Sequence, residues 1–96
     1  MIFDGFDWDT GNWPKCGKHG LTRSEVEEAL SGGCSVYPDV KHSEAEERFL
    51  AIGQASTGRW IFAAFCWRGD DENRLLRPIS ARPMHDREVQ HYVESQ

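Results

Sequence analysis

The clearest pattern in the sequence is a short amphipathic stretch in its first third. Thr22 has the side chain of a helix N-cap, and Glu25 stands three positions later, which is the spacing of a capping box. Apolar residues then recur at helical spacing: Val26, Ala29 and Leu30. Because the two glycines that follow Ser31 favour a helix end, the pattern predicts a helix over 22–31.

Beyond residue 33 the pattern changes to short runs rich in β-branched and aromatic residues, which are typical of strands. Turn segments rich in Gly, Ser, Asp and Asn separate the last three runs. The runs predict strands over 34–37, 47–54, 59–67 and 74–81. The 59–67 run is apolar on both faces, so we expect it to lie in the centre of the sheet.

The two ends of the chain complete the predicted architecture. Aromatic and acidic residues alternate through the first nine positions, which predicts an extended segment. Asn12 then caps a short helix that has Pro14 in its first turn. At the other end, apolar residues at helical spacing follow Pro83 and predict a helix over 84–94. The sum is one α+β domain, residues 1–96, with two N-terminal helices, an antiparallel sheet of three or four strands and a C-terminal helix.

Composition places the chain among globular proteins but argues against one class of partner. Of its 96 residues, 39% are hydrophobic and 28% are charged, and no apolar run approaches the roughly 18 residues of a membrane span. The net charge of -5 disfavours nucleic acid as a partner. The excess acid lies within 1–58, however, whereas 59–96 holds six Arg and six acidic residues. Because arginine binds phosphate bidentately, the second part of the chain keeps a nucleic-acid function open.

The cysteines indicate a reducing compartment and argue against a metal centre. An odd number of cysteines (Cys16, Cys34 and Cys66) does not make a disulfide framework, and the chain opens without the basic and apolar regions of a secretory signal. We therefore expect a cytoplasmic protein. Cys16 and His19 have the spacing of half a zinc site, but no second ligand pair follows, so neither a metal nor a cofactor is expected.

Two stretches carry a specific resemblance to a known family. The first, WDTGNWPKCGKHGL at 8–21, fits the pattern W-D-x-G-N-x-x-K-x-x-K-H-G, and the second, RPISAR at 77–82, fits R-x-I-S-A-R. With RFLAIG at 48–53 between them, the chain resembles the BrnT family of type II toxins over nearly its whole length. The resemblance implies a RelE-like fold, an RNA-cleaving activity that arrests translation, and a cognate ribbon-helix-helix antitoxin, BrnA. It also implies that DNA is bound only indirectly, through that antitoxin.

The chemistry that the resemblance implies needs an acid, a base and cations. RNA cleavage without a metal uses the 2′-hydroxyl of the substrate as nucleophile, so a base removes its proton, an acid protonates the leaving 5′ oxygen, and cations stabilise the transition state. The first motif offers Lys15 and Lys18 on one helical face and His19, which titrates near neutrality. His85 opens the last predicted helix, whose positive end favours a neutral imidazole suited to act as a base. Which of these four residues is the acid and which the base stays open.

The second motif offers Arg77 and Arg82 as further candidate catalytic residues. They are five positions apart, so on a regular strand they point to opposite faces, unless Pro78 introduces a bulge. Three more residues are candidates for binding RNA: Arg48, Arg59 and, by stacking on a base, Trp8. Each candidate also has an ordinary structural alternative, as a salt-bridge partner, a solvated charge or a core residue.

Two other functions compete with an RNA-cleaving toxin. The acidic balance also fits a non-catalytic, degenerate toxin that only binds its antitoxin partner. A DNA-binding regulator is disfavoured because no predicted helix carries a basic stripe and the 22–31 helix carries three glutamates. The leading hypothesis is therefore a metal-independent endoribonuclease toxin in which a local group of cations offsets an acidic surface.

Overall fold

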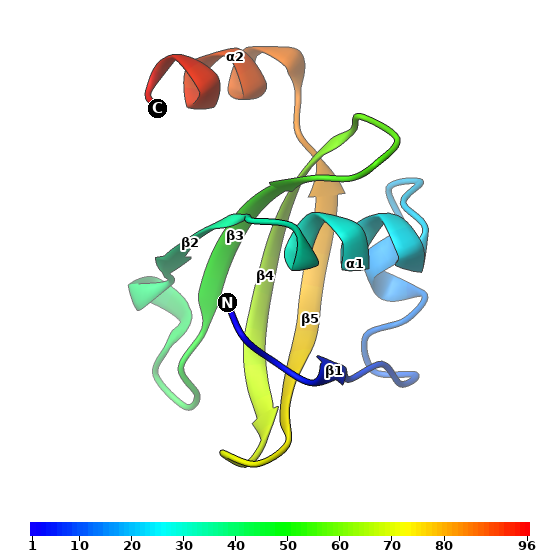
Figure 1. Ribbon diagram of the computed structural model, residues 1–96, viewed down its shortest axis with the longest axis vertical. Coiled ribbons are helices and arrows are strands. Elements are labelled where there is room, and N and C mark those ends of the chain that lie inside the picture. The colour runs from blue at the N-terminus through cyan, green and yellow to red at the C-terminus, as the bar shows by residue number, and fades with distance from the viewer.

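The chain builds a five-stranded sheet with one α-helix across it and a second beyond its end. A computed structural model describes residues 1–96. Its helices are α1 (Arg23–Ser31), α2 (Asp86–Glu94) and two short 3-10 turns, η1 (Lys15–Gly17) and η2 (Val40–His42). Its strands are β1 (Gly5–Phe6), β2 (Ser35–Pro38), β3 (Phe49–Gln54), β4 (Trp60–Gly69) and β5 (Arg74–Pro83). Figure 1 shows α1 lying over the sheet, whereas α2 stands apart from it beyond the end of β5.

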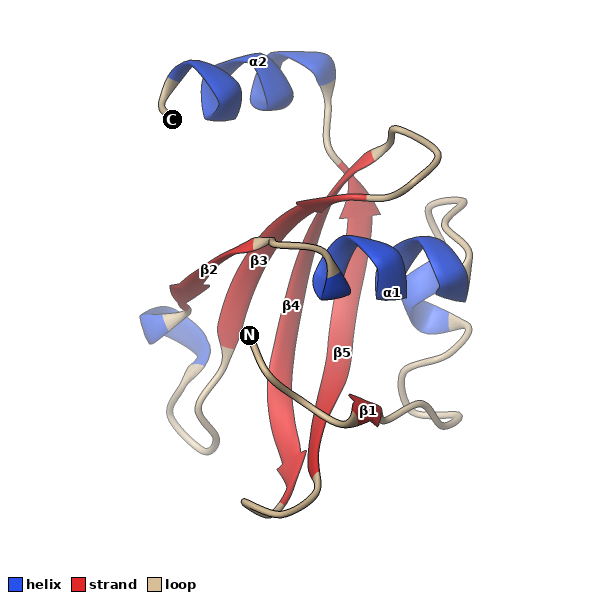
Figure 2. Ribbon diagram, in the orientation of Figure 1, coloured by secondary structure: helices blue, strands red, loops and turns tan.

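The sheet has the strand order β1-β5-β4-β3-β2 (Figure 2). Strands β2 to β5 form the predicted antiparallel meander, and β4 lies in its centre as expected. The prediction of three or four antiparallel strands is wrong at one edge, because β1 pairs in parallel with β5 and places Gly5 opposite Leu75. The N-terminal segment is anchored there by the Phe3 ring, whose centroid lies 5.9 Å from that of Trp67. Once anchored, its backbone satisfies the open edge of β5 and becomes a fifth strand.

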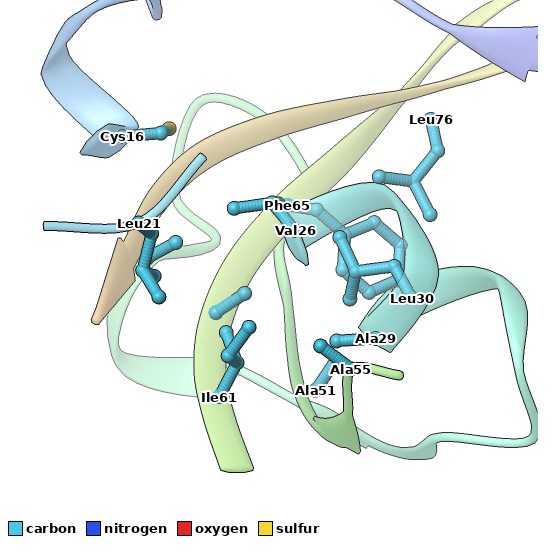
Figure 3. Packing of buried hydrophobic residues seen from close by; sticks show 12 residues of the cluster. Cys16, Leu21, Val26, Ala29, Leu30, Ala51, Ala55, Ile61, Phe65 and Leu76 are labelled. Carbon is cyan, nitrogen blue, oxygen red and sulfur yellow. The ribbon is translucent and has the colours of Figure 1, made fainter. Parts of the chain in front are cut away.

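Helix α1 covers one face of the sheet and closes the hydrophobic core on that side (Figure 3). Its capping box is present: the Thr22 hydroxyl accepts from the Glu25 amide, and the Glu25 carboxylate accepts from the Thr22 amide, both at 3.1 Å. The buried side chains that meet between α1 and the sheet include Val26, Ala29, Leu30, Ala51, Ile61, Ala63 and Phe65. Gly53 permits this close approach, because a Cβ there would overlap the Ala29 carbonyl oxygen.

The predicted first helix is only a short 3-10 turn, so the RelE-like layout with two N-terminal helices is wrong in that detail. Asn12 does not cap a helix, because its buried side chain binds backbone groups of the loop and of β5 instead. The turn ends at Gly17, and Gly20 has φ of +89°, which a right-handed helix does not contain. The chain between β1 and α1 is therefore a loop that follows the edge of β5.

The sheet face opposite α1 has no helix over its centre. Even-numbered residues of β4 lie on this side because the odd-numbered ones enter the core. Helix α2 reaches this face only at one end, where the Tyr92 ring packs against Trp60 at 5.6 Å and the Tyr92 hydroxyl hydrogen bonds to Ser35. No residue of α2 is buried, and neither α-helix is long and apolar enough to cross a membrane. We call this side, which carries Phe62, Ala64, Cys66 and Arg68, the open face.

Candidate functional site

Strand β5, which carries the second motif, is irregular at its centre. Pro78 pairs with Phe65, but the next pair joins Ser80 to Ala64, so Ile79 is an extra residue in the strand. Such a β-bulge shifts the alternation of side chains by one position. The residues before and after the bulge therefore lie on faces that simple counting does not predict.

The bulge places both arginines of the second motif on the open face. Arg77 stands opposite Cys66 and Arg82 opposite Phe62, and directly paired residues of two strands share a face. Of the two arrangements that the sequence left open, the structure has the bulged one, and Arg77 and Arg82 do not point to opposite faces. The physical reason is at Pro78, since proline cannot donate to the strand ladder and is tolerated in a sheet at bulges.

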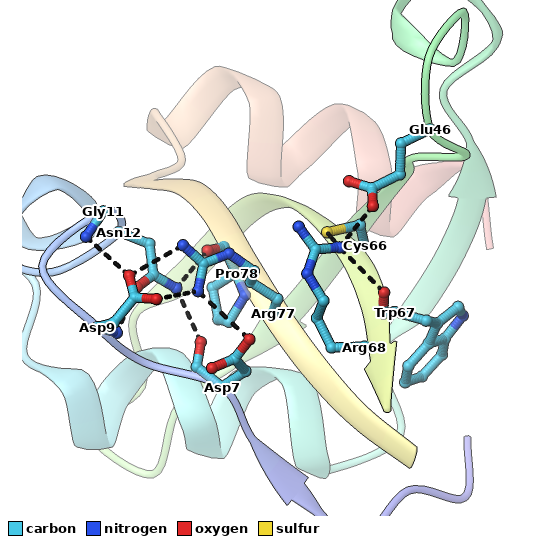
Figure 4. A network of polar contacts seen from close by, with 10 residues as sticks. All are labelled: Asp7, Asp9, Gly11, Asn12, Glu46, Cys66, Trp67, Arg68, Arg77 and Pro78. Atoms are coloured by element: carbon cyan, nitrogen blue, oxygen red, sulfur yellow. Dashed lines mark hydrogen bonds and ion pairs between the residues drawn. The ribbon is translucent and has the colours of Figure 1, made fainter. Parts of the chain in front are cut away.

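Carboxylates of the N-terminal loop hold Arg77 in place (Figure 4). Its guanidinium donates to the two oxygens of Asp9 at 3.0 and 3.1 Å, and a carboxylate oxygen of Asp7 lies 3.4 Å away. The hydrogen bonds from Arg77 lower the pKa of Asp9, and Asp9 raises the pKa of Arg77. Gly11 completes the arrangement, because its amide donates to Asp9 at 2.7 Å and a Cβ there would come within 3.0 Å of both partners.

Asn12 attaches the same loop to the bulged strand (Figure 4). Its amide nitrogen donates to the carbonyl oxygens of Asp7 at 2.9 Å and of Pro78 at 2.8 Å, and its amide oxygen accepts from the Asp9 amide at 2.8 Å. The residue is only 2% exposed. The first part of the opening motif is therefore a structural device that ties the loop ahead of η1 to the centre of β5.

The η1 turn brings the second part of that motif beside the end of β5. Lys15, Lys18 and His19 line a pocket there together with Arg82, and its volume is about 170 Å³. The other lining residues are uncharged: Phe62, Ser80 and Ala81. We call this cavity the first pocket. Four of the six predicted catalytic residues lie around it, although opposite ends of the sequence supply them.

The charges of the first pocket are unequally balanced. Lys15 and Lys18 are exposed and have no ion-pair partner. Arg82 donates two hydrogen bonds of 2.8 Å to the Glu88 carboxylate on α2 and lies over the Phe62 ring, 5.0 Å from its centroid. These bonds lower the pKa of Glu88 to about 2 and raise the pKa of Arg82. An anion in this pocket meets two unpaired lysines and one arginine that it must share with Glu88.

Five of the nine predicted site residues lie outside the first pocket, and three of them, His85, Arg59 and Trp8, have other partners or none. His85 is exposed and is the N-cap of α2, which starts two residues later than the predicted 84–94 helix, and the His85 amide donates to Glu88. Arg59 forms an ion pair of 3.3 Å with Glu25 of α1. The indole nitrogen of Trp8 donates to a carboxylate oxygen of Glu27 at 2.8 Å. Arg59 and Trp8 therefore each bind a glutamate of α1, which covers the other face of the sheet.

A second pocket of about 150 Å³ adjoins the first, and Lys15 lines both. Arg48, Arg77 and Arg68 line it together with Glu46. Sequence reasoning selected Arg48 and Arg77 but missed Arg68. The signal that points to Arg68 is its even-numbered position in the central strand, which puts it on the same side as Phe62. That signal has meaning only once the register of β4 against β5 is known.

The first pocket holds the groups that a reaction at a phosphodiester requires. Lysine and arginine cations stabilise the added negative charge of a transition state at phosphorus. The imidazole of His19, a group that can donate or accept a proton, lies among them. No three side chains of His, Cys, Asp or Glu come together where they could hold a metal ion.

Replacement of Asn12 tests whether its three hydrogen bonds hold the loop on β5. Asn12→Ala leaves two carbonyl oxygens and one amide without their buried partner, so we expect the free energy of unfolding to fall by about 2–3 kcal/mol. Thr10→Ala is the matched control, since Thr10 is exposed in the same loop and its side chain makes no hydrogen bond. Urea unfolding followed by circular dichroism measures both variants, and equal stability of the two would contradict this role.

The ion pair between Arg82 and Glu88 predicts a specific pH dependence. The folded protein holds the pKa of Glu88 at about 2, against an ordinary 4.5, so the stabilisation is present above about pH 4.5 and is lost as the pH falls through about 2. We therefore expect Glu88→Gln to lower the thermal unfolding midpoint near neutral pH and to match the wild type only below about pH 2. Subtracting the unfolding midpoint of the variant from that of the wild type at each pH cancels the titration of the other carboxyl groups. A difference in midpoint that does not change with pH would contradict the assignment.

Comparison with known proteins leads to the same family as the two motifs. The family model of BrnT, the ribonuclease toxin of type II toxin–antitoxin systems, matches residues 8–88. No curated protein matches the chain. The matched region includes every residue that lines the first pocket. The chain therefore belongs to the BrnT family of ribonuclease toxins of type II toxin–antitoxin systems.

Proposed function

We propose that this chain is the toxin of a type II toxin–antitoxin pair and that it cleaves RNA internally without a metal ion. The observation that supports this most directly is the first pocket, where Lys15, Lys18, His19 and Arg82 gather from both motifs. Membership of a ribonuclease family supports RNA as the substrate. Cleavage of RNA in the cytoplasm would then inhibit translation.

In the proposed reaction the scissile phosphate enters the first pocket. Lys15, Lys18 and Arg82 contact its non-bridging oxygens and stabilise the charge that develops there. A base removes the proton of the 2′-hydroxyl, the 2′ oxygen attacks phosphorus, and the bond to the 5′ oxygen breaks as an acid protonates that oxygen. The products are a 2′,3′-cyclic phosphate and a 5′-hydroxyl. His19 and one of the two lysines are the acid and base in this proposal, because His85 lies outside the pocket.

Arg82 takes part in this proposal only by giving up part of its pairing with Glu88. The incoming phosphate competes with the Glu88 carboxylate for the same guanidinium fork. The Glu88 side chain is partly exposed, so it can turn away from Arg82 towards solvent while Tyr92 keeps α2 against Trp60.

The proposed partner is a ribbon-helix-helix antitoxin of the BrnA type, and DNA is bound only through it. Membership of a type II toxin family supports a protein antitoxin. An antitoxin segment placed on the open face would cover the first pocket directly and so prevent RNA from entering it.

A non-catalytic toxin-like module is the second candidate function. Both motif arginines already have carboxylate partners, Arg77 in Asp9 and Arg82 in Glu88. If phosphate does not displace these carboxylates, Lys15 and Lys18 are the only cations of the first pocket that remain free to bind an anion. Antitoxin binding is then the remaining function.

RNA cleavage by the purified chain tests the proposed activity. We expect cleavage in the presence of a chelator, with 2′,3′-cyclic phosphate and 5′-hydroxyl ends. Lys18→Ala and Arg82→Ala each remove one stabilising charge, so kcat/KM should fall roughly 100-fold. Lys41→Ala is the matched control, because Lys41 is exposed and lies on η2, outside both pockets. Full activity of both pocket variants, or cleavage that requires a divalent cation, would show the site assignment to be wrong.

Bacterial growth distinguishes the two candidate functions. We expect expression of the chain alone to arrest growth, and co-expression of an adjacent ribbon-helix-helix gene to restore it. The Lys18→Ala variant should permit growth while still binding the antitoxin. Normal growth at verified levels of folded wild-type protein would instead favour the non-catalytic module.

A further inference from the structure

The second pocket has the composition of an anion site. Its lining includes four cationic residues and a single acidic one. The cations are Lys15, Arg48, Arg68 and Arg77, and the acidic residue is Glu46. The cavity volume of about 150 Å³ is close to that of the first pocket.

Two of the four cations have no carboxylate partner. Lys15 and Arg48 make no ion pair, and Arg48 is half-buried. The charge of Arg48 is felt by Glu46, whose pKa it helps to lower, but no carboxylate contacts its guanidinium directly. Arg77 is paired with Asp7 and Asp9, which do not line the pocket. The pocket therefore has an excess of positive charge at its surface.

Glu46 occupies the position that an anionic oxygen of a ligand would take. Its carboxylate accepts a hydrogen bond of 2.6 Å from Arg68, and its side chain is 44% exposed (Figure 4). The same Arg68 nitrogen lies 3.0 Å from the buried Cys66 sulfur. Because ion pairs this exposed are weak, a phosphate oxygen can replace the Glu46 carboxylate on Arg68.

The two pockets share one lining side chain. Lys15 lines both, and Arg77 and Arg82 lie on the same face of β5, on the two sides of the bulge. An extended strand of RNA that places one phosphate beside Lys18 can therefore place a neighbouring phosphate in the second pocket. The guanidinium fork of arginine matches a phosphate group bidentately, which suits Arg48 and Arg68 to this task.

We propose that the second pocket is a phosphate subsite, in which Arg48 and Arg68 bind a backbone phosphate of the RNA next to the phosphate in the first pocket. This inference rests on the proposed ribonuclease function. The subsite holds the RNA strand in position relative to the first pocket. The Glu46 carboxylate competes with the bound phosphate for Arg68. The Lys15 side chain shared with the first pocket favours RNA over an acidic segment of a protein partner, because a polynucleotide supplies one phosphate for each pocket.

Binding of uncleavable RNA tests the subsite without relying on catalysis. The probes are 2′-O-methyl oligouridylates of increasing length, and the affinity of the full chain is measured over a range of salt concentrations. For the wild type we expect affinity to rise when the probe becomes long enough to occupy both pockets. Arg48→Gln should lose that gain, bind long probes about tenfold more weakly at low salt, and show a salt slope smaller by about 0.7. Arg87→Gln on exposed α2 is the matched control, and we expect wild-type binding.

A second variant has an effect of opposite sign. Glu46→Gln removes the competing carboxylate, so long probes should bind several-fold more tightly while short probes bind as before. A purely structural role for the pair with Arg68 would weaken binding or leave it unchanged. Because Glu46 is exposed, this variant also keeps the test valid if Arg48→Gln does not fold.

The outcomes separate the subsite from the nuclease. If binding depends on probe length and salt, and both substitutions change it as expected, the subsite is supported. If ordinary RNA is nevertheless not cleaved, the nuclease proposal is overturned. Cleavage by the wild type together with unchanged binding slopes and length dependence in both variants would overturn the subsite. Weaker binding of the antitoxin by Arg48→Gln, with RNA binding unchanged, would assign the pocket to the protein partner instead and also overturn the subsite.

Discussion

The buried side-chain amide of Asn12 holds together the two parts of the chain that form the first pocket. It accepts from one loop amide and donates to one loop carbonyl and to the carbonyl of Pro78, next to the bulge in β5. The short η1 turn has a second anchor in Cys16, which is fully buried in the hydrophobic core. Asn12 and Cys16 together therefore hold Lys15 and Lys18 beside β5. Asn12 also keeps Asp9 on Arg77, so this one buried residue contributes to both pockets.

The electrostatic objection to an RNA substrate is answered by where the charges lie. The net charge is -5, but the three glutamates of α1 are on the opposite side of the sheet from the pockets. There Glu25 pairs with Arg59 and Glu27 with Trp8. The acids that do reach the open face, among them Glu46 and Glu88, each bind an arginine. These acids reduce the positive charge of the pockets without covering them. A local cationic site therefore exists on an acidic protein.

Much of the fold could be predicted from local pattern. The capping box of Thr22 and Glu25 is present, α1 ends at Ser31, and β4 is central. These features depend on residues close together in the chain, where capping and periodicity act. The short 3-10 turn and the parallel β1 strand were not predictable in the same way. The first depends on a buried amide that binds a distant strand, and the second on an aromatic contact between Phe3 and Trp67.

The sequence by itself determined the family, the order of most elements and the types of residue available for chemistry, because motifs, caps and apolar periods are properties of neighbouring positions. Only the tertiary structure decided which of those residues meet. The bulge at Ile79 turned Arg77 and Arg82 to one face, and the register of β4 added Arg68, which no motif marked. Counting along a strand predicts a face only while the ladder is regular, and one extra residue reverses it. The identity of the cations came from the sequence, but their arrangement came from a strand irregularity and one buried amide.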